Sequence, residues 1–483
     1  MFTVKYRCDT DMNSDNSACF GDCPKPKKSK PSEEICTIPY WAHLPSIVIH
    51  DIFDLLNKSD RQNASSVCKN WRQNVFHPKW WPEVTFKIQP YNIDRAKFFT
   101  SVFGKIVSVA RVQVNTLAPE CTDEFITLLE ALSENNNLKE LIIEPTHCHF
   151  NISRYHSKSS YNIQNVINIL KRCLPNLSKF SIGCIEDFAH YLDEYLMILA
   201  NQQSEKVTVL GLASVKDNPN EYEDSYFECD LIKPFTNLKV LSIDFDQLSD
   251  NFLSCLDDAK NLERLIVHLH GVRDGHPGTT NAAWADFKNQ HPKCELRLTV
   301  IHSYDEIKVL HETVLKGQMP LTHLKVFFCE NINMGVLEFL PAYYTETLRS
   351  IMWVDSLSNG KESWSFLTSH YDNSPDPLIM MSWLCKKLEE LVLYGYKYCE
   401  ENLVAIARLR GDKLKKLEVA KDDILLSNSD YNLSYGNFMI DIPLHLKQPW
   451  APTKTANLHP VIRNPTAGDS DEYLLPIVLA DLH

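Results

Sequence analysis

Few side chains in this sequence combine the residue types and the spacing that metal chemistry needs. Two short runs, His147–His149 and His268–His270, each place two histidines around a single residue. A zinc site usually draws on two pairs of ligands, and neither run has a second pair at a suitable spacing. Four cysteines precede residue 40 without forming a Cys-x-x-Cys pair: Cys8, Cys19, Cys23 and Cys36. We therefore interpret both runs as loop or strand-face histidines and expect no metal ion.

The patterns that signal catalysis are also missing. The chain has only 14 glycines, and none of them form a phosphate-binding loop. There is no Gly-x-Ser-x-Gly elbow and no His-Glu-x-x-His helix. We expect no catalytic residue and no cofactor. An enzyme on an unrecognised α/β fold is the alternative, and a deep pocket with convergent titratable groups would favour it.

A repeated phrase, apolar-x-x-apolar-x-apolar, organises the middle of the chain. Its clear copies begin at Leu138, Leu177, Val207, Leu238, Leu262, Leu321, Leu348, Leu388 and Leu414. Successive copies lie about 30 residues apart, and the end of each phrase alternates as a strand does. Amphipathic helical patterns separate the copies, for example Phe125, Leu128, Leu129 and Leu132.

A strand and a helix every 30 residues indicate a solenoid of leucine-rich repeats. The predicted fold class is α/β, with parallel strands and with helices on the convex side. Insertions at 145–160, 215–230 and 355–377 make the repeats irregular. A non-solenoid α/β domain is the alternative.

The register of the phrase predicts which side chains line the concave face of the sheet. We expect a substrate-binding surface there, formed by Arg264, His268, Arg297, Lys325, Phe327, Met352, Val392 and Tyr394. Basic side chains beside Met and aromatic groups suit a protein partner, including an acidic or phosphorylated peptide. The alternative is that tail or loop segments cover the apolar part and that the charges are simply solvated.

Residues 44–81 form a short helical module ahead of the repeats. Pro45 suits the start of a helix, and an apolar stripe runs along that helix through Ile49, Ile52, Phe53 and Leu56. Ser59, with Gln62 three residues later, predicts the start of a second helix. Fewer than 40 residues bury too little surface to be stable alone. Part of the apolar surface must therefore meet the rest of the chain or a partner.

This module resembles the F-box. The family pattern is met by Leu44-Pro45, Ile52-Phe53, Leu56, Asp60, Val67-Cys68, Trp71 and Trp80-Trp81. Only Trp80 departs, since the family more often has Leu there. The resemblance implies docking to the Skp-type adaptor of a cullin-RING ubiquitin ligase. It assigns adaptor binding to Leu44, Pro45, Ile49, Ile52, Phe53, Leu56, Asp60, Val67, Cys68 and Trp71.

The repeats resemble those of F-box proteins with leucine-rich repeats, although irregularly. The family's Asn or Cys after the last apolar position of each repeat appears clearly only as Cys329. Trp284 and Phe287, followed by HPKCELRLTV, are similar to a repeat of an F-box-only protein. Without the full ladder of Asn or Cys, the turns must satisfy their backbone groups in other ways.

Composition excludes several classes of protein. With 44% hydrophobic and 23% charged residues, the chain has the composition of a soluble globular protein. A net charge of −13 argues against binding to nucleic acid or to an anionic membrane. No apolar run reaches the roughly 18–20 residues of a membrane span. Fifteen scattered cysteines, an odd number, indicate a reducing compartment, so we expect a cytoplasmic or nuclear protein without disulfides.

We divide the chain into a disordered leader (1–38), an F-box (39–83), irregular repeats (84–440) and a Pro-rich acidic tail (441–483). Proline content argues against regular structure in the tail, although its stretch YLLPIVLADL could dock on the body. The functional hypothesis is a non-catalytic substrate receptor. It would bind the adaptor, and through it a cullin-RING core, with an unknown protein as substrate. A non-degradative scaffold that uses the F-box only to hold the adaptor is the main alternative.

Overall fold

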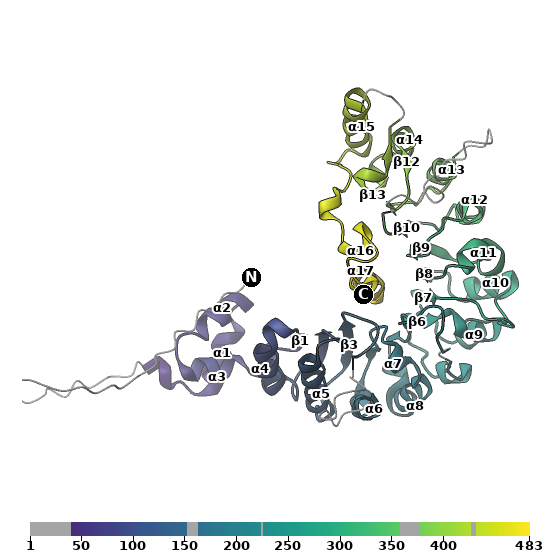
Figure 1. Ribbon diagram of the computed structural model, residues 1–483. Coiled ribbons are helices and arrows are strands. Elements are labelled where there is room, and N and C mark those ends of the chain that lie inside the picture. The colour runs from purple at the N-terminus through teal and green to yellow at the C-terminus, as the bar shows by residue number, and fades with distance from the viewer. Residues whose placement is uncertain (1–39, 152–162, 224–225, 358–375, 427–430) are drawn as a thin grey trace, which may run out of the picture. The chain divides into compact units, whose positions relative to one another are not determined.

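The structure, a computed structural model, describes residues 40–151, 163–223, 226–357, 376–426 and 431–483 (Figure 1). It divides after Val75 into two compact units, which we call the N-terminal unit and the repeat body. The predicted leader, with its four cysteines, lies outside the described residues, as does part of each predicted insertion. None of the described helices is both long and apolar enough to cross a membrane.

The N-terminal unit consists of three short helices, α1 (Ser46–Asp54), α2 (Lys58–Ala64) and α3 (Lys69–Val75). The second helix is capped by Asn57, whose side chain accepts a hydrogen bond from the backbone N–H of Asp60 at 3.0 Å. The predicted start at Ser59 was therefore two residues late.

The core of the N-terminal unit is small, with Ile49 and Phe53 fully buried, and an aromatic pair and a few hydrogen bonds support it. Phe53 is fully buried, and its ring meets Trp71 edge to face at 5.7 Å between centroids. The indole of Trp71 donates to the carbonyl of Trp41 at 2.9 Å, and the Asn70 amide donates to the carbonyl of Leu44 at 2.8 Å. These bonds tie the Leu-Pro start to the last helix.

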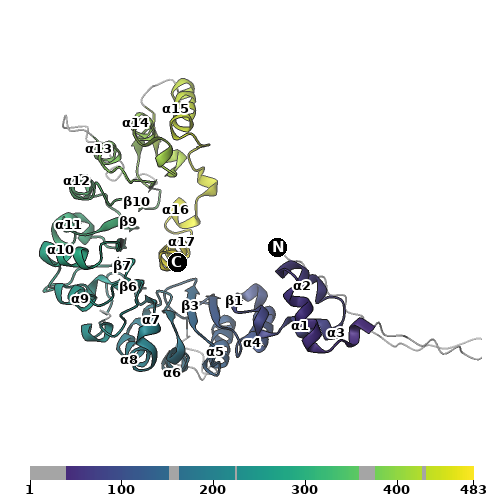
Figure 2. The same ribbon diagram turned by 180° about the vertical axis from the view of Figure 1, so that it is seen from behind.

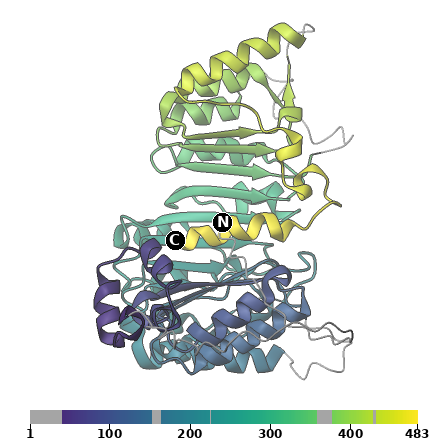
Figure 3. The ribbon, with the colours of Figure 1, turned by 90° about the vertical axis from the view of Figure 1, so that its left-hand side faces the viewer.

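The repeat body contains one sheet of twelve parallel strands in sequential order (Figures 1 and 3). The strands are β1 (Glu83–Ile88), β2 (Val109–Val114), β3 (Glu140–Pro145), β4 (Lys179–Ser181), β5 (Val209–Gly211), β6 (Val240–Asp244), β7 (Arg264–Leu269), β8 (Glu295–Ile301), β9 (Leu321–Phe327), β10 (Ser350–Val354), β11 (Glu390–Tyr394) and β13 (Lys416–Val419). Two short strands, β12 (Tyr398–Cys399) and β14 (Ile424–Leu425), pair separately. The predicted parallel solenoid is confirmed.

Helices cover the convex face of this sheet (Figures 1 and 2). They are α4 (Ile93–Phe103), α5 (Pro119–Ser133), α6 (Ile163–Cys173), α7 (Glu186–Ala189), α8 (Leu192–Gln203), α9 (Asp250–Cys255), α10 (Asn281–Gln290), α11 (Glu306–Thr313), α12 (Met334–Tyr343), α13 (Pro377–Leu384) and α14 (Glu400–Arg410). The apolar positions of the repeated phrase point toward them and form the main core; Leu141, Ile143 and Leu241 are examples.

Buried asparagines replace the missing ladder at two turns. The Asn135 amide donates to the carbonyls of Gly104 and Val107, at 3.2 and 2.7 Å. The Asn333 amide donates to the carbonyls of Ile307 and Lys308, at 2.7 and 2.8 Å. Each side chain thus gives a hydrogen-bond donor to buried carbonyls of the preceding repeat. Without that donor, the unpaired carbonyls would destabilise the fold.

The C-terminal region differs from the predicted irregular tail. It forms α15 (Tyr431–Leu446), α16 (Pro460–Arg463) and α17 (Ser470–Leu479), and a 3₁₀ turn (Ala480–Leu482) follows. The predicted boundary at residue 440 falls inside α15. Pro460 occupies a first helical turn, where the missing N–H costs nothing. Apolar side chains of α17, among them Leu474, Leu475 and Val478, are buried, and this burial outweighs the cost of Pro476 inside the helix.

The described cysteines are all free, and most of them are buried. Burial raises the pKa of Cys173, Cys294 and Cys385 to about 12, so their thiols are protonated and unreactive in the folded chain. We predict that alkylation of native protein labels only a minority of the thiols. Under denaturing, non-reducing conditions, intact-mass analysis should count all fifteen. Two or more protected pairs in protein from a reducing cytosol would contradict the absence of disulfides.

Candidate functional site

The N-terminal unit exposes a large apolar surface for its size. Leu55 is 87% exposed, Ile47 70% and Val67 64%. Trp41 and Val48 are also exposed. Soluble proteins seldom leave neighbouring large apolar side chains in water without a partner. The first candidate site is therefore this apolar face of α1 and the α2–α3 turn.

The structure divides the ten predicted adaptor residues into three groups. Pro45, Asp60 and Val67 are exposed. The half-buried group is Leu44, Ile52, Leu56, Cys68 and Trp71. Ile49 and Phe53 are fully buried and form the core of the unit instead.

Sequence reasoning missed three exposed apolar residues, Ile47, Val48 and Leu55. The helix α1 is apolar on more than one side, so periodicity found the stripe that faces inward and not the one that faces out. The available signal was the excess of apolar residues over what so short a unit can bury.

The second candidate site is the concave face of the sheet. The strand register places the predicted side chains on this one face. Lys325, Met352 and Val392 are neighbours across three adjacent strands. Two residues further along the same strands, Phe327, Val354 and Tyr394 are neighbours as well. The geometric part of the prediction, which residues share the face, is confirmed. Their predicted role in substrate binding stays a prediction.

This face is not open, because the C-terminal helix α17 lies on it (Figures 1 and 3). A second apolar cluster joins the sheet side chains to those of the C-terminal region. The sheet contributes Val209, Val240, Ile266, Phe327, Met352, Val354, Val392 and Tyr394. The C-terminal region contributes Leu458, Val461, Ile462, Leu474, Leu475, Val478, Leu479 and Leu482. The open face expected from the repeats alone was wrong. The alternative, that tail or loop segments cover the apolar part, is what the structure shows, although the charges of the face are paired rather than simply solvated.

Three cations of the concave face converge on one residue of the covering segment. The Arg297 guanidinium lies 2.6 Å from one carboxylate oxygen of Asp481, and the Lys325 ammonium lies 2.7 Å from the other. Arg264 donates to the backbone carbonyls of Asp481 and His483. Burial alone would raise the pKa of Asp481, but Lys325 and Arg297 outweigh it and hold the pKa below its usual range.

The two histidine runs, His147–His149 and His268–His270, make hydrogen bonds and ion pairs with other residues of the chain. The imidazoles of His268 and His270 both lie 3.1 Å from the carbonyl of Ser214, so the nitrogen that faces it carries the hydrogen in each ring. The buried carboxylate of Asp244 beside them accepts from the Ser214 N–H and lies 3.4 Å from the ammonium of Lys216. One nitrogen of each ring and a carboxylate oxygen of Asp244 lie within 4.8 Å of one another. The cation already present in this cluster is Lys216.

The other run lies against the start of α17. His147 is 3.5 Å from the carboxylate of Asp469, and His149 is 3.0 Å from that of Asp217. The N–H of Cys148 donates to Asp471 at 2.8 Å. Burial raises the pKa of Cys148, and it also raises that of Asp471.

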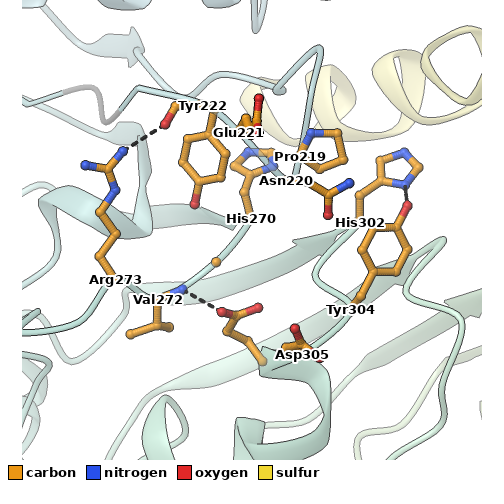
Figure 4. A pocket seen from close by; sticks show the side chains of 12 residues that line it. Pro219, Asn220, Glu221, Tyr222, His270, Val272, Arg273, His302, Tyr304 and Asp305 are labelled. Atoms are coloured by element: carbon orange, nitrogen blue, oxygen red, sulfur yellow. Dashed lines mark hydrogen bonds between the residues drawn. The ribbon is translucent and has the colours of Figure 1, made fainter.

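A polar pocket of about 300 Å³ opens among the loops that follow β7 and β8 (Figure 4). Tyr222, His270, Arg273, His302 and Tyr304 contribute to its lining. It is the kind of feature that an enzyme would need. Burial, however, lowers the pKa of His270 to about 3 and that of His302 to about 4, so both rings stay neutral and weakly basic near pH 7. Neither fits a general acid or base at neutral pH.

Comparison with known proteins adds sequence evidence to this geometry. A family model described as F-box-like matches residues 41–87. The chain is 23% identical to F-box only protein 33 of Homo sapiens over 469 residues, which cover 85% of this chain and 82% of that protein. It is 24% identical to F-box/LRR-repeat protein 21 of Ovis aries over 432 residues, which cover 85% of this chain and 89% of that one. The loose similarity to an F-box-only protein expected from residues 284–300 therefore extends over most of the chain.

Similar solved structures include one titled as the yeast Rad7 and Elc1 complex, with a TM-score of 0.38 and 13% identity over 79% of this chain and 88% of that one. An internalin of Listeria monocytogenes has a TM-score of 0.28 and 13% identity over 71% and 86% of the two chains.

The helical unit and the parallel strand–helix sheet together define an F-box protein with a leucine-rich-repeat-like region. Within that class, the chain is distantly similar over most of its length to F-box only protein 33 and to F-box/LRR-repeat protein 21.

The contact between His302 and α17 predicts a pH dependence. Nε2 of His302 lies 3.0 Å from Oγ of Ser470 in a partly buried position. An unfolded histidine has a pKa near 6.5. Between pH 6.5 and 4, His302 is therefore protonated in the unfolded chain and neutral in the folded chain. As the pH falls through this range, His302 lowers the free energy of unfolding by up to about 1.4 kcal/mol per pH unit.

We predict that His302→Gln reduces this loss. Urea unfolding of the wild-type and variant chains at pH 7 and pH 5 measures it, since the other buried histidines contribute equally to both. The expected result is a smaller shift of the midpoint for the variant. Parallel shifts in the two chains would contradict the assignment to His302.

Proposed function

We propose that this chain is the substrate-recognition subunit of an SCF-type cullin-RING ubiquitin ligase. In this proposal the N-terminal unit binds a Skp-type adaptor, and the repeat body binds a protein substrate. The observation that carries the proposal is the exposed apolar face of a three-helix unit whose sequence follows the F-box pattern. The proposed site of action is the cytoplasm or the nucleus, where thiols stay reduced.

The size of the apolar face fits a stable contact. Burying one exposed Leu, Ile or Val side chain contributes about 1.5–3 kcal/mol. Leu55, Ile47 and Val67, exposed to 87%, 70% and 64%, together offer about twice that amount to a partner. The small core around Phe53 leaves these three side chains for a partner, which explains why so short a unit has so many large apolar residues.

A substrate receptor needs no catalytic group of its own. Its task is to hold a target close to the transferase and so raise the effective concentration of the target there. The low basicity of His270 and His302 in the polar pocket agrees with a non-catalytic role.

A non-degradative scaffold is the second candidate, and one observation favours it. The concave face, where the repeats would bind a substrate, is covered by α17. The two functions differ in outcome. A substrate receptor co-purifies with a cullin and supports ubiquitination of a bound protein, whereas a scaffold of this kind binds the adaptor without that activity.

We predict that the double substitution Leu55→Ala and Val67→Ala weakens adaptor binding by at least about 2 kcal/mol, or roughly 30-fold in Kd. Both side chains are exposed, so the circular dichroism of the variant should match that of the wild type. Titration of a purified Skp-type adaptor against the full chain measures the effect.

The matched control is Tyr91→Ala, which removes a side chain 85% exposed on the repeat body. It should leave adaptor binding unchanged. Phe53→Ala is unsuitable as a test, because the buried ring supports the unit itself and its loss would mix folding with binding. Equal affinity of the double variant and the wild type would rule out the proposed face.

A further inference from the structure

The C-terminal segment that covers the concave face has two parts, residues 450–469 and residues 470–482, and the sheet holds them by different contacts. Its first part is tied to the body by backbone and side-chain bonds. The Leu357 N–H donates to the carbonyl of Ile462 at 2.6 Å, and Lys421 and Trp450 make further bonds between this part and the last strands. Its second part, residues 470–482, rests on the middle of the sheet through apolar contacts and the ion pairs of Asp481. A few side-chain hydrogen bonds add to these, from the Cys148 N–H to Asp471 and between His302 and Ser470. The second part can leave while the first part stays attached.

The second part depends on the body for its own structure. A helix of ten residues is marginal in water, and Pro476 removes one of the few internal hydrogen bonds of α17. Undocking would therefore melt α17 as well. The released chain regains conformational entropy, which offsets part of the cost of lost contacts.

The cations beneath Asp481 are only partly satisfied by it. Arg297 and Lys325 share the Asp481 carboxylate, whereas Arg264 reaches only backbone carbonyls of the segment. Glu295, on the same strand as Arg297, adds a second carboxylate 3.4 Å from Arg297. The Nε atoms of Arg264 and Arg297 are buried and have no hydrogen-bond partner among the described residues. Burial lowers the pKa of Arg264, and Coulomb repulsion from Arg297 lowers it further. This cluster can accept a more highly charged anion than a single carboxylate.

We propose that residues 470–482 are an internal surrogate for a protein ligand of the concave face. The ligand is a peptide segment with an apolar helical turn followed by an acidic residue, and a phosphorylated serine or threonine fits best at the position of Asp481. Phosphate carries up to two charges and three acceptor oxygens, which match three cations and their unused donors. The ligand binds by displacing α17, and this inference rests on the proposed function because it defines the substrate class of the same receptor.

Competition between the segment and the ligand makes the affinity depend on how often the segment is undocked. The apparent Kd equals the intrinsic Kd divided by the fraction of molecules with an open face. Asp481→Asn keeps the shape of the side chain but removes its charge, so it raises that fraction. Glu472→Gln is the matched control, because it removes an acidic group from the same segment at a half-exposed position away from the three cations.

The experiment titrates the full chain with fluorescent peptides of residues 468–483 that carry phosphoserine, Asp or Ala in place of Asp481. We expect the phosphoserine peptide to bind at least tenfold more tightly than the Ala peptide. Its affinity for Asp481→Asn should be at least tenfold higher than for the wild type and for Glu472→Gln. Adaptor capture, measured on the same preparations, should be equal for all three chains.

Three results would overturn the inference. One is equal binding of the phosphoserine and Ala peptides, and another is equal affinity of Asp481→Asn and the wild type. The third is peptide-independent dimerisation of Asp481→Asn, which would make a second copy of this chain the partner of the open face. Any of these with adaptor capture intact leaves the proposed function standing, whereas loss of adaptor capture from the wild-type chain refutes the proposed function itself.

Discussion

A parallel β-sheet whose strands carry apolar side chains on both sides needs both of its faces covered. In this chain the helices of the repeats cover the convex face. The concave face carries Ile266, Phe327, Met352, Val392 and Tyr394, which would form a large apolar patch in water. The C-terminal segment meets this requirement, and the second apolar cluster is the result. The arrangement of the repeat body from residue 450 onward follows from that single constraint.

Electrostatics determine where the segment sits along the sheet. Apolar contacts have no direction, so they would tolerate α17 at several positions. The buried carboxylate of Asp481 tolerates only one, because moving it would separate it from Lys325 and would leave Arg297 with Glu295 as its remaining partner. The same ion pairs also make the docked segment displaceable, because a more strongly charged group of a ligand can replace the Asp481 carboxylate.

Sequence reasoning was successful wherever a pattern repeats. The phrase at Leu238, Leu241 and Ile243, and at its other copies, predicted parallel strands and their register, because the same apolar spacing recurs wherever one strand–helix unit stacks on the next. The F-box pattern was found for a similar reason, since several weak signals occur in a set order. Both findings rest on local spacing, which a sequence displays directly.

The sequence could not show what depends on contacts between distant segments. Prolines at 460 and 476 indicated an irregular tail. Pro460, however, lies in the first turn of a helix, where its missing N–H costs nothing, and burial against the sheet more than offsets the backbone cost of Pro476. The F-box pattern assigned Phe53 to adaptor binding. In the structure Phe53 is buried in the core of the unit, and Leu55 is exposed instead. The eight side chains assigned to an open substrate face do share that face. His268 contacts Ser214, however, and the others meet the C-terminal segment, which lies far along the chain from them.

Hydrogen–deuterium exchange of residues 470–482 in the unliganded full chain tests this account most directly. If the segment covers the concave face in solution, the amides of α17 exchange far more slowly than those of a free peptide of the same sequence. Exchange should accelerate when Lys325 is replaced by Met, which removes the charge that holds Asp481 and keeps most of the volume. Exchange of these amides in the wild-type chain as fast as in the free peptide would contradict the account, because the concave face would then be uncovered.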